Sequence, residues 1–340
     1  MKFSHIRAVF LSRTREFYRD KASLMWNLAM PVLIVFAFAT IFSGNQADVF
    51  KIGIVDPAPA DSVKPALLDF AYVTRVIVSD LDAGITKVER QQLDLLLAPD
   101  RDGARYWVND ESARGYLAER LLLGGAAAAS EQYVRQTVSG RALRYVDWVV
   151  PGVLAMNMMF SALWGVGYVI VRYRKNGVLR RFSATPLTAT EFLFAQVLSR
   201  MAVITVVSIL VYVGSDLALD FTMRGSHLVL GLVFLAGAFS LVCVGLLISA
   251  RTRSEELADG LLNLLSWPMM LLSGMWFSLE GSPAFVQQVA QLLPLTHLIA
   301  AARAVMIDGA GLTQVWGEIA ILVAVALAAL LVAARLFKWQ

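Results

Sequence analysis

Long runs of apolar residues without charge divide the chain into candidate membrane spans. A helix that crosses a bilayer needs about 20 predominantly apolar residues. Four runs contain no Asp, Glu, Lys or Arg, and they cover residues 24–42, 148–171, 228–250 and 261–279. Two further runs each carry one charge near an end, Arg200 in 196–215 and Glu318 in 315–334. The pattern predicts six transmembrane helices, the first of them within residues 23–43.

Two other segments are expected to lie at the membrane surfaces. In residues 1–22, four large apolar side chains fall within about 60° of one another on a helical wheel; they are Phe3, Ile6, Phe10 and Phe17. Basic and apolar residues combined in this way are typical of an amphipathic interfacial helix. The apolar stretch 292–302 is too short to cross, and prolines flank or interrupt it. We therefore expect residues 281–307 to form a re-entrant segment at the outer leaflet.

Residues 44–146 form one large polar insert between the first two spans. Strands are expected at 50–56, 73–78, 93–98 and 105–110, and helices at 57–70, 82–92 and 111–136. Gly124 and Gly125 could interrupt the last helix. Alternating strands and helices predict a small α/β domain, and about 100 residues suffice for one modest core.

The composition agrees with an integral membrane protein. Hydrophobic residues make up 58% of the chain and charged residues only 16%, with a mean hydropathy of +0.62. Soluble domains have about 25% charged residues, and disordered chains are poor in apolar residues. A single cysteine, Cys243, excludes a disulfide scaffold. The first apolar run contains Pro31 and has no clear cleavage site after it, so we expect an anchor helix rather than a signal peptide.

The distribution of Lys and Arg sets the expected orientation. Basic residues gather in segments 2–21, 172–181, 251–253 and 335–338, whereas the opposite short loops hold only Arg224 and Arg303. By the positive-inside rule, both termini are cytoplasmic and residues 44–146 are extracytoplasmic. The net charge of +4 therefore reflects topology, and no nucleic-acid partner is expected.

The sequence lacks the motifs of several enzyme classes. It contains no G-x-x-x-x-G-K-[ST], H-E-x-x-H or G-x-S-x-G motif, so we expect no catalytic residue, metal or cofactor in this chain. The span interiors carry almost no charge, whereas ion-coupled transporters usually place ionisable groups there. As possible substrate-path residues we single out Asn157, Asn263 and Ser273. A transporter without its own ion relay is expected to take energy from a partner.

The cytoplasmic segment 172–191, after the second span, carries the most specific pattern. A basic cluster precedes Gly177, a short amphipathic turn follows, and Pro186 ends any helix before it. We expect a short helix that lies across the cytoplasmic mouth and docks into a partner. Leu179 and Phe182 are three residues apart and share one helical face, which is predicted to fill an apolar groove of that partner.

This segment resembles the permease subunit of type 2 ATP-binding-cassette (ABC) exporters, whose pattern is G-[TV]-L-x-R-L-x-x-[TS]-P-[LV]. The matching coupling segment comprises Asn176, Gly177, Val178, Leu179, Arg180, Arg181, Phe182, Ser183, Ala184, Thr185 and Pro186. The C-terminal third, including LLSGMWFSLE and LLPLTHLIAAARAVM, is similar to the same family. One departure is Arg174-Lys175-Asn176, where many relatives carry Glu ahead of the glycine.

The resemblance implies a non-catalytic permease in the bacterial cytoplasmic (inner) membrane. It implies a dimer with a second permease chain, identical or different, and a separate cytoplasmic ABC ATPase dimer that binds ATP and Mg²⁺. Such assemblies can include a periplasmic adaptor. The substrate is not implied. The predicted fold is thus a polytopic α-helical membrane protein with six spans, an N-terminal interfacial helix, an extracytoplasmic α/β domain, and a membrane domain over 147–340.

Two other classes of function compete with this interpretation. An ion-coupled secondary transporter is disfavoured by the nearly charge-free span interiors. A membrane-anchored sensor or scaffold that acts through its outer domain would need neither six spans nor the basic docking turn. An ATPase gene beside the gene for this chain would distinguish the exporter from both.

Overall fold

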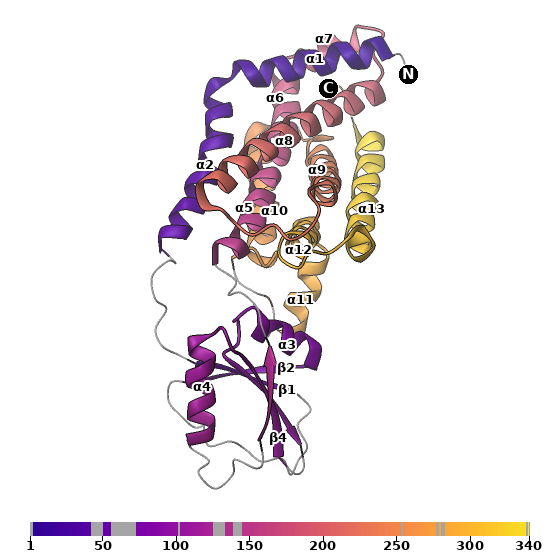
Figure 1. The fold of residues 1–340 in the computed structure, drawn as a ribbon. Helices are drawn as coiled ribbons and strands as arrows, with labels where there is room; N and C mark the ends of the chain where they lie inside the picture. The colour runs from indigo at the N-terminus through magenta and orange to yellow at the C-terminus, as the bar shows by residue number, and fades with distance from the viewer. Residues whose placement is uncertain are drawn as a thin grey trace. The chain divides into compact units, whose positions relative to one another are not determined.

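A computed structural model describes residues 3–41, 50–55, 73–100, 103–124, 133–138, 145–252, 254–276, 279, 283–337 and 339. The chain divides into two units (Figure 1). The helical unit comprises Met1–Ala39 and Val146–Gln340, and the sheet unit comprises Thr40–Tyr145.

The helical unit is built around a central apolar helix. Its helices are α1 (Phe3–Arg19), α2 (Lys21–Ile41), α5 (Tyr145–Ala162), α6 (Val169–Lys175), α7 (Val178–Ser183), α8 (Ala189–Leu219), α9 (His227–Ser249), α10 (Glu255–Leu272), α11 (Ala284–Gln291), α12 (Pro294–Met306) and α13 (Leu312–Leu336). A π-helical segment, η3 (Leu163–Tyr168), joins α5 to α6. Helix α9 packs against η3, α8, α12 and α13, since a helix that is apolar on all sides must be covered by other helices or by lipid. Both chain ends lie at the same end of this unit as α7 (Figure 1).

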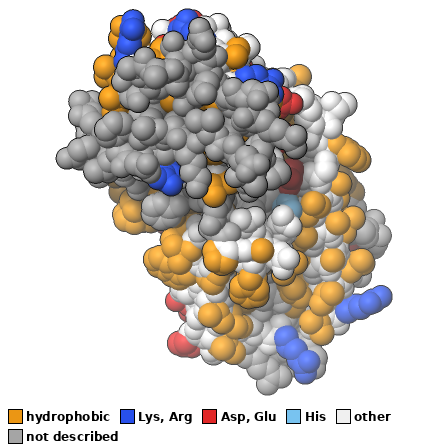
Figure 2. Space-filling model, turned by 90° about the horizontal axis from the view of Figure 1, so that it is seen from below, with side chains coloured by type: hydrophobic (Ala, Val, Ile, Leu, Met, Phe, Trp, Pro, Cys, Tyr) orange, Lys and Arg blue, Asp and Glu red, His pale blue; other side chains and the backbone are white. Residues whose placement is uncertain are grey.

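Four helical segments are long and apolar enough to cross a membrane. They are Val146–Lys175, Ala189–Leu219, His227–Ser249 and Leu312–Leu336. Two bent pairs raise the number to as many as six: Phe3–Arg19 with Leu24–Ala37, bent by 63°, and α11 with α12, bent by 90°. Hydrophobic side chains cover much of the described surface in Figure 2. The chain is therefore mostly helical and polytopic, with four to six candidate spans in its described part.

The predicted span at 261–279 has the wrong bounds. Helix α10 begins at Glu255 and ends at Leu272, and its first two turns carry Glu255, Glu256 and Asp259. Gly274 has a φ of 70°, in the left-handed region that glycine adopts most easily, so the helix cannot continue through it. The apolar run predicted the position of a helix, but the turn at Gly274 cuts that helix short.

The segment α11–α12 has the geometry of a broken span or a re-entrant loop. Pro283 caps the start of α11 and Pro294 opens α12, where a missing N–H does no harm. Arg303 of α12 donates hydrogen bonds to the carbonyl oxygens of Trp148, Gly274 and Met275, at 3.3, 2.8 and 3.1 Å. Its guanidinium also lies 3.6 Å from the centre of the Trp148 ring. This arginine joins α12 to α5 and to the turn after α10.

The sheet unit contains a five-stranded sheet in the order β2-β1-β3-β4-β5. The strands are β1 (Phe50–Val55), β2 (Val73–Val78), β3 (Leu95–Asp100), β4 (Gly103–Asn109) and β5 (Tyr133–Val138), and only the β3–β4 pair is antiparallel. Leu95 and Leu97 pack with Leu122 of α4 (Ala113–Gly124). Leu96 packs with Val88 of α3 (Leu81–Glu89). Successive side chains of β3 thus supply two cores on opposite faces, because strand side chains alternate.

Within the insert, one predicted element is wrong. The helix expected over 111–136 ends at Gly124, and residues 133–138 form strand β5 instead. Val134 and Thr137 are β-branched, and β5 pairs in parallel with β4 from Ala104↔Tyr133 onward. The strands expected near residues 50, 73, 93 and 105 correspond to β1 to β4. The helix expected over 57–70 lies outside the described residues.

Candidate functional site

The predicted coupling segment is a tight elbow between α6 and α8. Helix α6 ends at Lys175, Asn176 caps it, and Gly177 has a φ of 68°. A side chain would be strained in that conformation, so glycine allows the chain to reverse into α7. Helix α7 covers Val178–Ser183 and starts with a hydrogen bond from Arg181 N to Gly177 O.

One face of α7 is buried in its own chain. Leu179 has an exposed fraction of 0%, and the Phe182 ring lies 5.7 Å from that of Phe192. Arg180 and Arg181 are exposed on the opposite side. The prediction that Leu179 enters a partner's groove is therefore wrong, because this side chain already fills a site in the helical unit. The side of α7 available to a partner is the arginine side.

The residues after α7 attach it to the start of α8. The Thr185 hydroxyl donates a hydrogen bond to Phe182 O at 2.6 Å. Thr188 and Glu191 form a capping box, in which each side chain binds the other residue's backbone N–H. Asn176, Ser183, Ala184, Thr185 and Pro186 are all exposed. The elbow is thus held by local hydrogen bonds, and most of its residues are exposed.

The C-terminal tail supports the same elbow. The buried Phe192 contacts the rings of Phe337 and Trp339, with centroid distances of 6.0 and 5.5 Å. Arg174 donates to the carbonyl oxygens of Ser249 and Ala250, at 3.0 and 3.2 Å, and also to that of Thr252. The departure from the family pattern at Arg174 therefore has a structural role, since this guanidinium binds the carbonyl end of α9.

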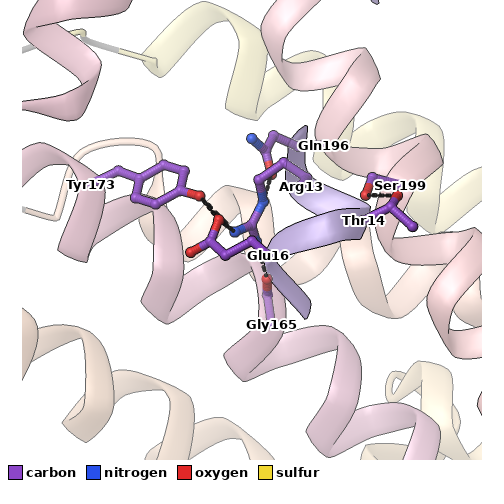
Figure 3. Close-up of polar contacts among 7 residues, drawn as sticks. All are labelled: Arg13, Thr14, Glu16, Gly165, Tyr173, Gln196 and Ser199. Atoms are coloured by element: carbon purple, nitrogen blue, oxygen red, sulfur yellow. Dashed lines mark hydrogen bonds and ion pairs between the residues drawn. The ribbon is translucent and has the colours of Figure 1, made fainter. Parts of the chain in front are cut away.

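Helix α1 is attached to α8 and α6 by a polar network (Figure 3). The Arg13 guanidinium donates to Gln196 Oε1 at 2.9 Å, to the Tyr173 hydroxyl at 2.7 Å, and to Glu16 at 2.8 Å. It also donates to Gly165 O at 3.1 Å, and the hydroxyls of Thr14 and Ser199 are 2.9 Å apart. His5 lies 3.2 Å from Glu191, the residue of the capping box.

The predicted apolar face of α1 is partly exposed and partly packed against the rest of the helical unit. Phe3 is 79% exposed, whereas Ile6, Phe10 and Phe17 are half-buried. Val9 is buried as well. The helical-wheel analysis therefore found a real face, but most of that face packs against the helical unit. Sequence reasoning missed Arg13, because one basic residue among several in this segment carries no signal beyond the charge distribution that predicts topology.

A cavity of about 800 Å³ lies behind this network, bounded by α1, α2, α5, η3, α6 and α8. Asn157 lines it, but the other two candidate path residues do not. Asn263 donates to the Asp259 carbonyl oxygen, and the Ser273 hydroxyl donates to Met270 O. The structure thus does not bring the three together. In the described part of the chain, no group of His, Cys, Asp or Glu could hold a metal ion.

Taken together, the candidate spans and the separate sheet unit between α2 and α5 are those of a polytopic membrane protein with one inserted domain. The chain belongs to the ABC-2 transporter family, since residues 21–335 match the family described as ABC-2 family transporter protein.

Three relatives from Escherichia coli strain K12 are similar to this chain. YbhS, a probable multidrug ABC transporter permease, is 21% identical over 347 residues that cover 91% of this chain and 90% of YbhS. YhhJ, an inner membrane transport permease, is 28% identical over 180 residues, which are 51% of this chain and 47% of YhhJ. YbhR, a probable multidrug ABC transporter permease, is 23% identical over 201 residues, which are 59% of this chain and 55% of YbhR. The family and its members indicate a transport function.

Proposed function

We propose that this chain is the membrane permease of an ATP-driven exporter, and that it acts as a dimer coupled to a separate cytoplasmic ABC ATPase. Its membership of the ABC-2 family supports the proposal, as does the match to YbhS over nine-tenths of both chains. The sequence has no phosphate-binding loop of its own, so ATP and Mg²⁺ would bind to the ATPase. The substrate would pass between two permease chains.

Helix α7 carries the coupling role in this proposal. The supporting observation is its division into a buried face at Leu179 and an exposed face at Arg180 and Arg181. A buried anchor makes the helix move with α8, so that a force on the arginines reaches a candidate span. The arginines would pair with acidic residues of the ATPase and contribute to specificity more than to raw affinity.

The proposed location is the inner membrane, with both termini and α7 in the cytoplasm and the sheet unit outside. Both chain ends lie at the end of the helical unit where α7 lies, and this agrees with the Lys and Arg distribution (Figure 1). Single-cysteine labelling in a Cys243→Ser background tests the orientation. A cysteine at the exposed Glu111 should react with an impermeant maleimide in intact cells, and one at Arg180 only in opened cells. The reverse result would reject the orientation.

Purification from its native membrane in mild detergent tests the assembly. We expect an ABC ATPase, a second permease chain and any periplasmic adaptor to co-purify. The chain freed of every other polypeptide should hydrolyse no ATP. ATP turnover that persists in the pure chain would contradict the proposal.

Charge reversal on α7 tests the coupling itself. Arg180→Glu with Arg181→Glu should leave the chain inserted but abolish its association with the ATPase and its export activity. The matched control is Arg7→Glu with Arg15→Glu, which changes the charge equally at two exposed positions of α1. Normal association and export by the α7 variant would show that these arginines serve topology alone.

A further inference from the structure

The cavity of about 800 Å³ has a polar end and an apolar end. The charged lining residues lie toward one end of the helices that carry them, and apolar residues predominate toward the other. Along α8, Gln196 and Arg200 come before Val203, and along the α5–α6 segment the apolar Met156 comes before Arg172. Charged residues of α1 line the polar end, and the later turns of α2 contribute methionine, proline and isoleucine. Arg172 follows Met156 by 16 positions, which corresponds to about 24 Å at 1.5 Å per residue. This length is close to half a bilayer with its head groups, about 20–22 Å.

The polar end contains a buried hydrogen-bond donor without a partner. Gln196 is 1% exposed, and its Oε1 accepts a hydrogen bond from Arg13. Its Nε2 atom is buried and has no hydrogen-bond partner among the described residues. Buried donors are normally satisfied, because leaving one without an acceptor is costly.

Arg200, one helical turn further along α8, is a buried cation without an anionic partner. Its exposed fraction is 8%, and it donates to Ser161 O at 2.7 Å and to Ser161 Oγ at 2.6 Å. Its guanidinium also lies 5.2 Å from the centre of the Phe17 ring. Across the described part of the chain, no ion pair joins Arg200 to a carboxylate. Since a guanidinium stays charged even when it is buried, the site lacks an anion.

The backbone beside Arg200 is shaped for this guanidinium. A Cβ atom at Gly165 would lie 2.0 Å from Arg200 Cζ, so only a glycine leaves room for it. Gly165 belongs to the π-helical segment η3, and π-helical turns occur frequently at functional sites. Of the two carboxylates that line the cavity, Glu16 and Asp20, Glu16 is paired with Arg13. The lining therefore has three arginines against two carboxylates, and it contains the unpartnered Gln196 Nε2 donor.

We propose that this cavity binds an amphiphile with an anionic head group, a phosphate or a carboxylate. The oxygen atoms of the head group accept hydrogen bonds from Arg200 and from Gln196 Nε2, since a guanidinium matches both groups in geometry. The hydrocarbon chain lies along Met30, Met156 and Val203. A lipid of the membrane and an exported anionic amphiphile share this chemistry.

Native mass spectrometry of the purified full-length chain tests the site, with phosphatidylglycerol titrated against phosphatidylcholine as the probes. We expect one phosphatidylglycerol to bind per chain in preference to phosphatidylcholine. Arg200→Gln and Gln196→Leu should each weaken this binding by about tenfold or more, because each removes a buried donor to a charged group. Arg180→Gln, which removes an exposed arginine outside the cavity, should leave it unchanged.

A second variant keeps the test decisive if Arg200→Gln does not fold. Val203→Phe retains both donors but fills the apolar end, so it should also exclude the lipid. Equal binding of the two lipids by the wild-type chain, or wild-type binding in a folded Val203→Phe or Gln196→Leu chain, would overturn the proposal. The mass of the co-purified ligand separates the two sources, since a glycerophospholipid identifies the membrane and another anionic amphiphile identifies an exported molecule. This binding test does not depend on ATP-driven export.

Discussion

Leu179 anchors α7, so shortening this side chain should release the helix locally. The side chain is completely buried, and replacing a buried leucine by alanine costs about 2–5 kcal/mol. Helix α7 has six residues, and the cost is expected to appear as local opening rather than as unfolding of the whole chain. At about 1.4 kcal/mol for each factor of ten, even the lower value raises the opened population about 25-fold.

Hydrogen exchange measured by mass spectrometry on the full-length chain would detect this opening. Amides of residues 178–184 should exchange about 25-fold faster in Leu179→Ala than in the wild type. Arg180→Ala serves as the control, because it removes an exposed side chain next to the anchor and should leave the exchange rates unchanged. A folded Leu179→Ala chain in which α7 exchanges at the wild-type rate would refute the role of Leu179 as an anchor.

Three further predictions concern stability. Gly165→Ala should lower the melting temperature in detergent, because the new methyl group would displace Arg200. The control is Gly231→Ala, whose methyl group meets no atom within 4 Å and should stabilise its helix by about 0.5–1 kcal/mol. Equal melting temperatures for the two would contradict this. Arg303→Lys should cost about 2 kcal/mol or more, measured in the same assay, because one ammonium group cannot reach three carbonyl oxygens; an unchanged melting temperature would argue against it. Burial and a hydrogen-bonded carboxylate raise the pKa of Tyr106 to about 12, so the neutral phenol stabilises the sheet unit below pH 10 and this stabilisation is lost as the pH rises to 12. Tyr106→Phe should lose less stability over that range, followed by tryptophan fluorescence, and an equal loss in both chains would exclude this linkage.

The apolar runs predicted where helices lie better than they predicted where helices end. An apolar run reports which residues can be buried in lipid or protein, and the runs at 148–171 and 228–250 match the long helices Val146–Lys175 and His227–Ser249 to within a few residues. The turn at Gly274 and the 90° bend between α11 and α12 depend on backbone conformation and on partners such as Arg303. Those partners come from distant segments, and no local pattern identifies them.

The candidate site shows the same division between local and distant information. The spacing of Leu179 and Phe182 correctly placed them on one side of α7. Whether that side meets a partner or the chain itself depends on Phe192 in the next helix and on Phe337, which follows α13 about 145 positions further along the chain. The cavity at Arg200 could not be predicted from the sequence either, since one charge near the end of an apolar run is typical of an ordinary helix boundary.

The network that attaches α1 to α8 also constrains how the protein is assembled during synthesis. Arg13 and Gln196 are 183 positions apart, and Thr14 and Ser199 are 185 positions apart. At about 5–20 residues per second, the ribosome needs roughly 10–40 s to make α8 after α1 has emerged. During this interval α1 has none of its α8 partners, and in the proposed topology its apolar side chains would hold it at the membrane surface. Although α1 is translated first, its contacts with α8 therefore form late, and they can form only after α8 has been synthesised.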